Sequence, residues 1–291
     1  MNIGIVGLGL MGGSLGRALC KLTENKVFAT DKDEEAMMKG ALLKAYHERL
    51  THENAAEIDV LVMALLPSAM PSVAEEYLPL LKDGAVVTDI AGVKRPVVAL
   101  MKELSAKFPS LSFAGGHPMA GREFSGVAHS AVNLFEGSTV LLVPVDSPLE
   151  TLAALKNLYT SVGAEGVVIT SAEDHDKMIS YTSQLAHVVS SAYVQSPSAH
   201  RHYGYSAGSF RDMTRVARMN ADMWTELMTD NADYLAEEVR DIADRLDAFA
   251  ACLEKGDAAA LHDMLERGNE TKLAVEKNRG KKLAEALTET L

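Results

Sequence analysis

The first thirty residues of this chain carry a glycine pattern that few folds can accommodate. Gly7, Gly9 and Gly12 form G-x-G-x-x-G directly after the apolar run NIGIV, where an amphipathic helical stretch begins. The first glycine permits a tight turn, the second lets the backbone approach a pyrophosphate, and the third lets helix and strand pack closely. We therefore predict a dinucleotide-binding β-α-β unit, in which Leu10 and Met11 start the helix whose N-terminus faces the phosphates.

An aspartate closes this unit. The next apolar run, KVFAT, ends at Asp31, about 20 residues after the glycines, which is the spacing of the ribose-binding acid. A carboxylate there accepts hydrogen bonds from the ribose and repels the 2′-phosphate of NADP. Asp31 favours NAD as the cofactor, although the adjacent cation Lys32 can soften the discrimination.

The chain changes character near residue 170. Short apolar runs at 2–6, 26–30, 59–65, 85–90, 111–115, 139–143 and 166–169 alternate with helical stretches, which is typical of a mostly parallel sheet covered by helices. Beyond that point helical spacing dominates, at 172–195, 221–253 and from 258 onward. We expect a Rossmann-type α/β domain over residues 1–170 and an all-α domain for substrate binding and dimerisation over residues 171–291.

The charge balance limits the partners. A net charge of −12 and a pI near 5.2 argue against nucleic-acid binding, which needs clustered cations. An anionic substrate would need a local cationic site. No cationic stretch precedes the first apolar run, and no apolar run reaches the length of about 20 residues that spans a bilayer. We expect a cytoplasmic protein without membrane contact, and its two cysteines lack metal-ligand spacing, so we expect no metal.

Three groups of residues are candidates for the chemistry. His117 follows two glycines at a strand end, where an imidazole can accept a proton from a substrate hydroxyl. Ser183 and His187 share a helix face, and three helical turns place Asp176 near it; the alternative is a solvated helix side. Arg211, Arg215 and Arg218 form a cationic stripe, of which one anchors a substrate anion. The other two arginines are expected to pair with surface acids such as Asp212 and Asp222.

Two further residues lie at predicted strand ends, where open α/β sheets bind ligands. Asp89 is predicted to contact the cofactor. Pro67 either shapes the wall near the nicotinamide or is an ordinary loop proline.

Five ordered motifs resemble the prephenate/arogenate dehydrogenases of tyrosine biosynthesis. They are the glycine motif, TDIAGVK (88–94), GGHPMAGRE (115–123), HDKMISYTSQLAH (175–187) and GSFRDMTR (208–215). The resemblance implies NAD-dependent oxidative decarboxylation of prephenate to 4-hydroxyphenylpyruvate, or of arogenate to tyrosine. It implies that His117 polarises the ring hydroxyl, that Arg215, in the element starting at Gly208, binds a substrate carboxylate, and that His187 and Ser183 face the substrate side chain. Glu123 and Asp212 match acids of a gating ionic network.

Some positions depart from the family pattern. Gly92 replaces a serine that would hydrogen-bond the catalytic histidine or the nicotinamide, and Gln184 and Ala186 interrupt a common S-H-x-P-H pattern. These departures leave the substrate open, with His187 favouring prephenate. The long C-terminal helices suit a homodimer, or else they pack only within the monomer. At 291 residues we expect a monofunctional chain.

Two other functions remain as alternatives. A β-hydroxyacid dehydrogenase or imine reductase also joins a nucleotide domain to a helical domain, but the hydroxyacid enzymes need a catalytic lysine after a G-x-x-G pattern, which this chain lacks at the domain boundary. A non-catalytic NAD-binding protein would bind NADH without turnover.

Overall fold

A computed structural model describes the backbone of residues 1–288 and the side chains of residues 1–277. It contains one eight-stranded sheet in the order β3-β2-β1-β4-β5-β6-β7-β8. The strands are β1 (Asn2–Val6), β2 (Lys26–Thr30), β3 (Glu48–Arg49), β4 (Val60–Met63), β5 (Val86–Asp89), β6 (Ser112–Pro118), β7 (Thr139–Val145) and β8 (Gly166–Ile169). Neighbouring strands run parallel except β6 and β7, which are antiparallel.

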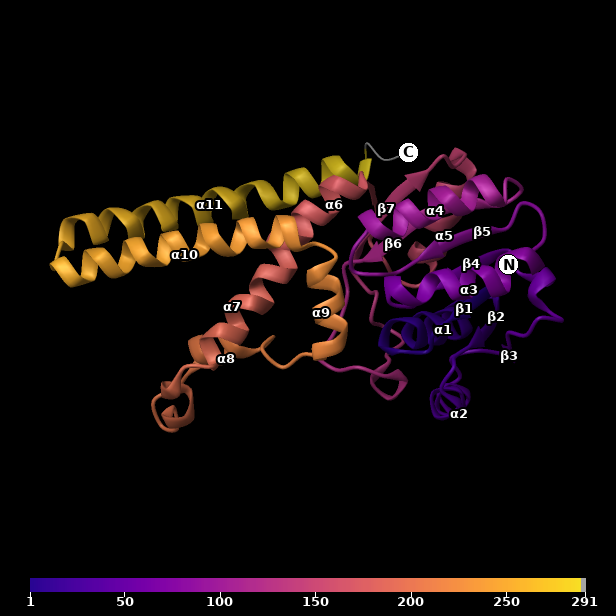
Figure 1. Ribbon diagram of the computed structural model, residues 1–291, viewed down its shortest axis with the longest axis horizontal. Helices are drawn as coiled ribbons and strands as arrows, with labels where there is room; N and C mark the ends of the chain where they lie inside the picture. Colours follow the sequence, from indigo (N-terminus) through magenta and orange to yellow (C-terminus); the bar gives the residue numbers. More distant parts are fainter. Residues whose placement is uncertain (289–291) are drawn as a thin grey trace.

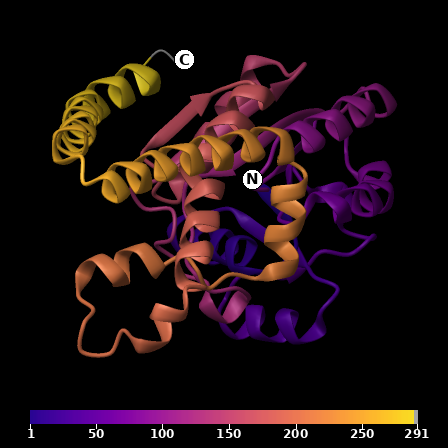
Figure 2. The same ribbon diagram turned by 60° about the vertical axis from the view of Figure 1, so that its left-hand side comes forward.

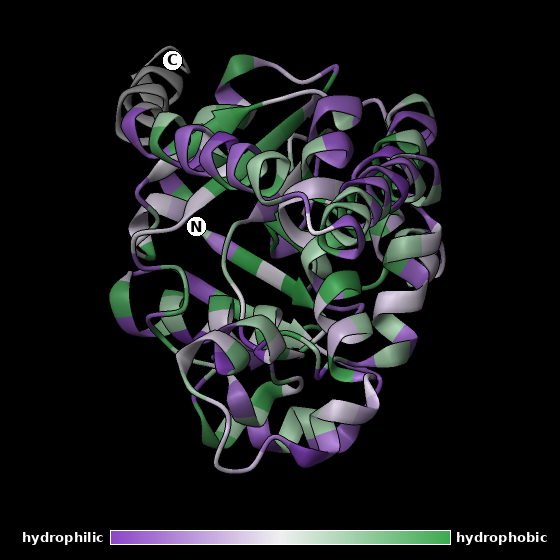
Figure 3. Cartoon of the chain, turned by 90° about the vertical axis from the view of Figure 1, so that its left-hand side faces the viewer, coloured by the Kyte–Doolittle hydropathy of each residue, from purple (hydrophilic) through white to green (hydrophobic). Residues whose placement is uncertain are grey.

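Helices cover both faces of the sheet. One core cluster joins α1 (Leu10–Leu22) and α5 (Leu149–Ser161) to the sheet, and the other joins α3 (Met70–Tyr77) and α4 (Arg95–Lys107) to the opposite face. The central strands β1, β4 and β5 are buried on both faces and therefore read as continuous hydrophobic runs. In Figure 3 the strands are largely hydrophobic, whereas the helices alternate hydrophobic and hydrophilic residues.

The predicted strands are all present, and the expected α/β domain followed by helices is confirmed. The prediction missed β3, a two-residue, exposed edge strand that carries only Glu48 and Arg49 and therefore has no apolar signal. It also ended β6 too early. This strand continues through His117 to Pro118, because its last residues pair with Val140 and Leu141 of β7.

The remaining chain is helical. It comprises α6 (Ala172–Ile179), a π-helical segment (Ser180–Gln184), α7 (Leu185–Val194), α8 (Gly208–Thr214), α9 (Ala221–Thr229), α10 (Ala232–Lys255) and α11 (Ala258–Thr288). Figure 1 shows α10 and α11 side by side as a long hairpin that projects away from the sheet, and Figure 2 shows α7 and α9 in front of the sheet. Residues 289–291, the end of the predicted helical domain, lie outside the described residues. Among the helices of the described chain, none combines the length and the apolarity needed to cross a membrane.

Candidate active site

The glycine loop between β1 and α1 has the geometry of a phosphate-binding turn. Gly7 has a φ of 100°, which favours glycine, and a Cβ on Gly12 would lie 2.0 Å from the carbonyl oxygen of Gly7. Gly9 differs, because a Cβ there would meet no protein atom within 4 Å. The backbone at Gly9 therefore borders open space at the helix N-terminus, which fits the pyrophosphate of a dinucleotide.

Asp31 lies beside this loop at the end of β2. Its carboxylate accepts hydrogen bonds from the backbone N–H of Leu8 (2.6 Å) and of Asp33 (2.9 Å). These bonds fix the carboxylate next to the glycine turn, which is the arrangement that a ribose-binding acid requires.

Two other residues predicted to contact the cofactor lie outside the cavity lining. Asp89 is fully buried, pairs with the ammonium of Lys94, and accepts the backbone N–H groups of Ala91 (2.7 Å) and Gly116 (3.0 Å). Because internal partners occupy its carboxylate, the structure gives Asp89 a supporting position beneath the site. Pro67 starts a short 3-10 helix (Pro67–Ala69) after β4, while Leu65 and Leu66 line the cavity instead.

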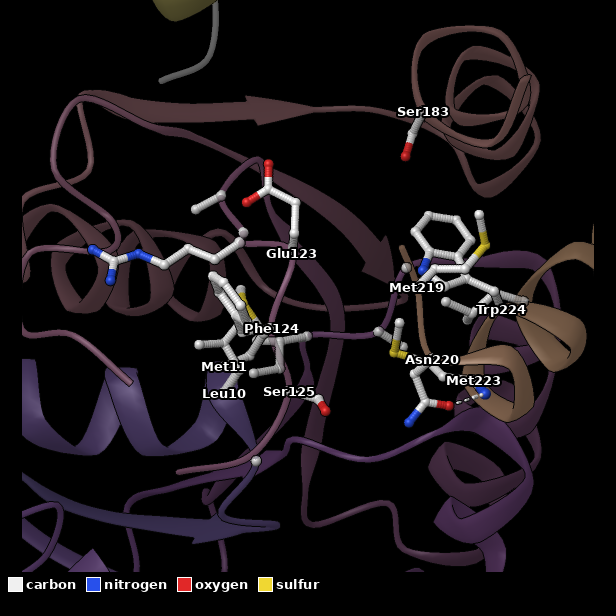
Figure 4. Close-up of a pocket in the computed structure, with 18 of the residues that line it drawn as sticks. Leu10, Met11, Glu123, Phe124, Ser125, Ser183, Met219, Asn220, Met223 and Trp224 are labelled. Carbon is white, nitrogen blue, oxygen red and sulfur yellow. Dashed lines mark hydrogen bonds between the residues drawn. The ribbon is translucent and has the colours of Figure 1, made fainter. Parts of the chain in front are cut away.

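A cavity of about 640 Å³ lies between the sheet and the helices. In Figure 4, Leu10, Met11, Glu123, Phe124 and Ser125 lie on one side of it, and Ser183, Met219, Asn220, Met223 and Trp224 lie on the other. The loop after β6 crosses above the glycine turn, since Val127 would be 2.8 Å from a Cβ on Gly13. The cavity thus joins the nucleotide-binding end of the sheet to the helical region.

His117 lines this cavity at the end of β6 and is tied to two residues of α6. Its Nδ1 lies 2.8 Å from Nε2 of His175, and Nδ1 of His175 lies 2.7 Å from Oδ1 of Asp176. Asp176 is fully buried and also accepts the backbone N–H of Lys94 (2.7 Å) and of Arg95 (2.8 Å). The result is a continuous series of hydrogen bonds from His117 in the cavity, through His175, to the buried carboxylate of Asp176.

The surroundings of His117 favour its neutral form. Burial of the ring lowers the pKa of His117 well below its ordinary value, and its electrostatic interactions with His175 and Lys94 lower it further. Burial opposes ionisation of Asp176, but the hydrogen bonds from His175, Arg95 and Lys94 outweigh it, so the pKa of this carboxyl lies below its ordinary value. The neutral imidazole of His117 can accept a proton from a ligand in the cavity.

Ser183 and His187 line the same cavity from the π-helical segment and α7. Nδ1 of His187 donates to the carbonyl oxygen of Ser183 (2.9 Å), and the imidazole packs on Trp224 with ring centroids 3.9 Å apart. Asp176 does not share this face, contrary to the prediction. The π turn between the two residues holds more residues per turn than an α turn and therefore shifts the phase of the helix, and Asp176 points to the start of α4 instead.

Gln184 occupies a position where the resemblance leads one to expect another residue, and it is a buried residue of the cavity lining. Its Nε2 donates to the carbonyl of Leu227 (2.9 Å), and its Oε1 accepts Nδ2 of Asn231 (2.8 Å). Asn231 also donates to the carbonyl of Asp176 (2.9 Å) and accepts from Arg95 (2.9 Å). This network connects the π-helical segment to α9, α10 and α4.

The predicted arginine stripe is interrupted because α8 ends at Thr214. Arg215, just after it, forms an ion pair with Glu123 across the cavity, and Arg218 lines the cavity rather than pairing with a surface acid. Arg211 lies 3.7 Å from Asp212, and both are exposed. Asp212 and Gly208 therefore lie outside the cavity lining, although both were predicted as site residues.

The charge of the cavity is opposite to that of the whole chain. Its lining includes three arginines, Arg122, Arg215 and Arg218, and one acid, Glu123. The chain as a whole carries −12. The cavity therefore supplies the local attraction for an anion that the sequence led us to expect.

Comparison with known proteins agrees with this geometry. The sequence profile "Prephenate dehydrogenase, nucleotide-binding domain" matches residues 15–168, and "Prephenate dehydrogenase, dimerization domain" matches residues 171–267. The chain is 30% identical over 285 residues to the prephenate dehydrogenase of Lactococcus lactis, covering 95% of this chain and 78% of that protein.

Two solved structures are similar in fold. Prephenate dehydrogenase from Aquifex aeolicus in complex with hydroxyphenyl propionate and NAD⁺ superimposes with a TM-score of 0.82 at 26% identity, covering 94% of this chain and 98% of that one. Synechocystis arogenate dehydrogenase gives a TM-score of 0.76 at 25% identity, covering 94% and 99% of the two chains.

Proposed function

The chain belongs to the prephenate dehydrogenase family, and we propose that it oxidatively decarboxylates prephenate to 4-hydroxyphenylpyruvate with NAD. One observation carries this proposal: a single cavity brings together the glycine turn, the neutral imidazole of His117 and a cationic lining. Oxidation of a ring hydroxyl in a dianionic substrate needs these three elements. NAD bound over Gly9 supplies the hydride acceptor, with Asp31 at its ribose.

His117 acts as the base. Its ring takes the proton of the ring hydroxyl while the hydrogen on the same carbon leaves as hydride. The bond from the ring to its carboxylate then breaks, CO₂ departs, and the electrons of that bond make the ring aromatic. The proton returns from His117 to the phenolate oxygen, so atoms and charges balance without net proton release.

The cations bind the substrate. We assign one substrate carboxylate to Arg215, which pairs with Glu123 in this structure. When the substrate enters, its carboxylate replaces Glu123 on the guanidinium or binds beside it. Glu123 thereby closes the cavity mouth in the absence of substrate. Ser183 and His187 face the substrate side chain. For Gly208 and Asp212, whose positions lie outside the lining, we assign no direct contact.

A second candidate substrate is arogenate, which carries an amine in place of the side-chain keto group. The carbonyl of Ser183 can only accept, so Nδ1 of His187 carries the proton, and Nε2 of the neutral ring is an acceptor. Burial lowers the pKa of His187 and keeps the ring neutral. An acceptor at this place suits an ammonium group better than a ketone, contrary to the preference for prephenate that we drew from the sequence.

We also propose that the enzyme is a cytoplasmic homodimer whose second domain begins near residue 171. The match of residues 171–267 to a domain described as a dimerization domain supports the dimer. Leu246 of α10 and Leu265 of α11 are more than half exposed in the isolated chain, which supports a partner on this hairpin.

The test is steady-state kinetics with NAD and each candidate substrate, followed by NADH absorbance, with the product identified by mass spectrometry. We expect NADH and 4-hydroxyphenylpyruvate in equal amounts from prephenate. Arogenate and NADP in parallel reactions measure the preference for each. Turnover of a small β-hydroxyacid without turnover of prephenate would assign the chain to another dehydrogenase class, and tight NADH binding without any turnover would make it a binding protein.

A further inference from the structure

We propose that His175 and Asp176 are positioning residues that fix the tautomer of His117, so that its Nε2 is a free base in the cavity. The inference rests on the proposed function for its catalytic meaning. Its structural content, the position of one proton on the His117 ring, stands independently of the substrate.

The direction of the hydrogen bonds from Asp176 through His175 to His117 follows from the buried carboxylate of Asp176. Asp176 is fully buried, and its oxygens accept from two backbone N–H groups, so it stays ionised and can only accept. The contact of 2.7 Å with Nδ1 of His175 therefore has the proton on that nitrogen.

The same logic carries the direction to the cavity. His175 is almost fully buried, and this burial lowers its pKa and favours the neutral ring. A neutral His175 with its proton on Nδ1 offers only a lone pair at Nε2. The contact of 2.8 Å from this atom to Nδ1 of His117 then requires the proton on the His117 side. Neutral His117 is thereby left with a lone pair on Nε2, the ring nitrogen available to the cavity, and this is the form that accepts a hydroxyl proton.

Within the part of the chain that the structure describes, His175 is the one residue that hydrogen-bonds the His117 ring. Gly92 lines the same cavity and offers no hydroxyl. Lys94, the nearest buried cation, pairs with Asp89 instead. His175 is 1% exposed, and its two ring nitrogens are both occupied, by His117 and by Asp176, so it is held between them.

The direct test is the ¹⁵N spectrum of the histidine rings in the full-length protein, which distinguishes a protonated from an unprotonated ring nitrogen. The His117 signals are assigned by their loss in His117→Ala. We expect the proton on Nδ1 of His117 at neutral pH. A proton on Nε2 in the wild-type protein overturns the proposal, whatever the substrate proves to be.

Kinetics provide a second test through rescue. His175→Leu removes the acceptor for Nδ1 of His117, and we expect kcat/KM to fall about 100-fold. His175→Gln keeps an amide oxygen that can accept this proton, and we expect it to recover most of the loss, to within about 10-fold of the wild type. Equal losses in the two variants contradict a role in proton placement.

A double variant separates action through His117 from a general effect on the fold. If His175 acts only through His117, then His117→Ala/His175→Leu is no slower than His117→Ala, to within about threefold. Losses that multiply overturn the proposal. The control is His52→Gln, which removes a surface histidine 2.8 Å from the carboxylate of Glu76 and should leave kcat/KM unchanged.

Failure of the proposed function gives a different result. In that case prephenate gives no NADH with the wild-type protein, while the ring spectrum still shows or excludes the proton on Nδ1.

Discussion

At the residue scale, the site depends on which form of each histidine is stable at neutral pH. His117 and His187 are both partly removed from water, and burial lowers the pKa of each. A base must be neutral before it accepts a proton, so the lowered pKa of His117 keeps the active form populated.

This leads to a prediction on pH. His117 is neutral at pH values above its pKa and becomes protonated as the pH falls through that pKa, which lies well below 6.5. We expect kcat/KM for prephenate to stay constant from neutral pH down past 6.5 and to fall only at lower pH. The groups that face His117 are His175 and Lys94, and Glu123, Arg215 and His187 share its cavity. His187→Gln should show the same low-pH inflection, whereas an inflection at or above 6.5 would refute the assignment.

The sequence predicted some of these residues and missed their partners. His117 follows a recognisable strand end, and Arg215 and Glu123 lie in recognisable motifs. His175 opens one of the recognised motifs, but no role follows from its position there, and nothing in the sequence pairs Lys94 with Asp89. Residues 117 and 175 are 58 positions apart. Their contact depends on how α6 packs against the end of β6, which no local pattern encodes.

At the element scale, two glycines of the turn have different roles: Gly12 is needed for folding, and Gly9 for binding a ligand. A Cβ on Gly12 would collide with the backbone of Gly7, whereas a Cβ on Gly9 would enter open space beside the cavity. The first position is required by the packing of α1 on β1. The second is free in the protein alone and is required only when a ligand approaches.

We therefore predict that Gly9→Ala raises the KM for NAD by about tenfold or more, because the new methyl group occupies the space of the pyrophosphate. The thermal unfolding midpoint should change little, since no protein atom is displaced. Gly268→Ala, at another position open to 4 Å, is the control and should leave the KM unchanged. An unaltered KM in Gly9→Ala would show that the cofactor does not lie over this turn.

The π-helical segment is a second element, and the hydrogen bonds that hold it make a contribution to stability that can be measured. Asn231 is fully buried and connects it to α6 and to Arg95. Asn231→Ala leaves several buried polar groups without a partner, and we expect it to lower the free energy of unfolding by about 2 kcal/mol or more. Urea unfolding measures this. Asn269→Ala on exposed α11 should lower the free energy of unfolding far less. An equal loss in the two variants would mean that the buried network does not contribute to stability beyond an exposed hydrogen bond.

The helical spacing of apolar residues predicts the order of the helices, but it does not predict the π turn. A π turn replaces one hydrogen-bonding pattern by another without a characteristic composition. It is the reason that Asp176 and His187 lie on different faces, where regular α-helical geometry would have aligned them.

At the scale of the whole molecule, the hairpin of α10 and α11 packs on the other helices and on β8 near its base, whereas its turn end projects from the rest of the described chain. Figure 1 shows it extending away from the sheet. Composition and periodicity predicted long amphipathic helices here, but they left two readings open, a dimer or packing within the monomer. The exposed leucines favour the dimer.

We predict that Leu246→Glu weakens the dimer at least tenfold, because it places a charge on an apolar face where Leu246 is 59% exposed. Sedimentation velocity over a range of concentrations measures the shift toward the monomer. Leu42→Glu at the end of α2 (Glu34–Leu42), where the leucine is 84% exposed, is the control and should leave the dimer intact. A monomeric wild-type protein, or a variant that remains fully dimeric, would contradict this assignment of the interface.

The central claim is that His117 is the base of an NAD-dependent oxidation in the cavity between the two parts of the chain. The most direct measurement is kcat/KM for prephenate, from NADH absorbance, in the wild-type protein and in His117→Ala, together with the Kd for NAD. We predict a loss of about 10²- to 10⁴-fold in kcat/KM, with the Kd for NAD unchanged. Activity that survives the substitution undiminished would contradict the claim.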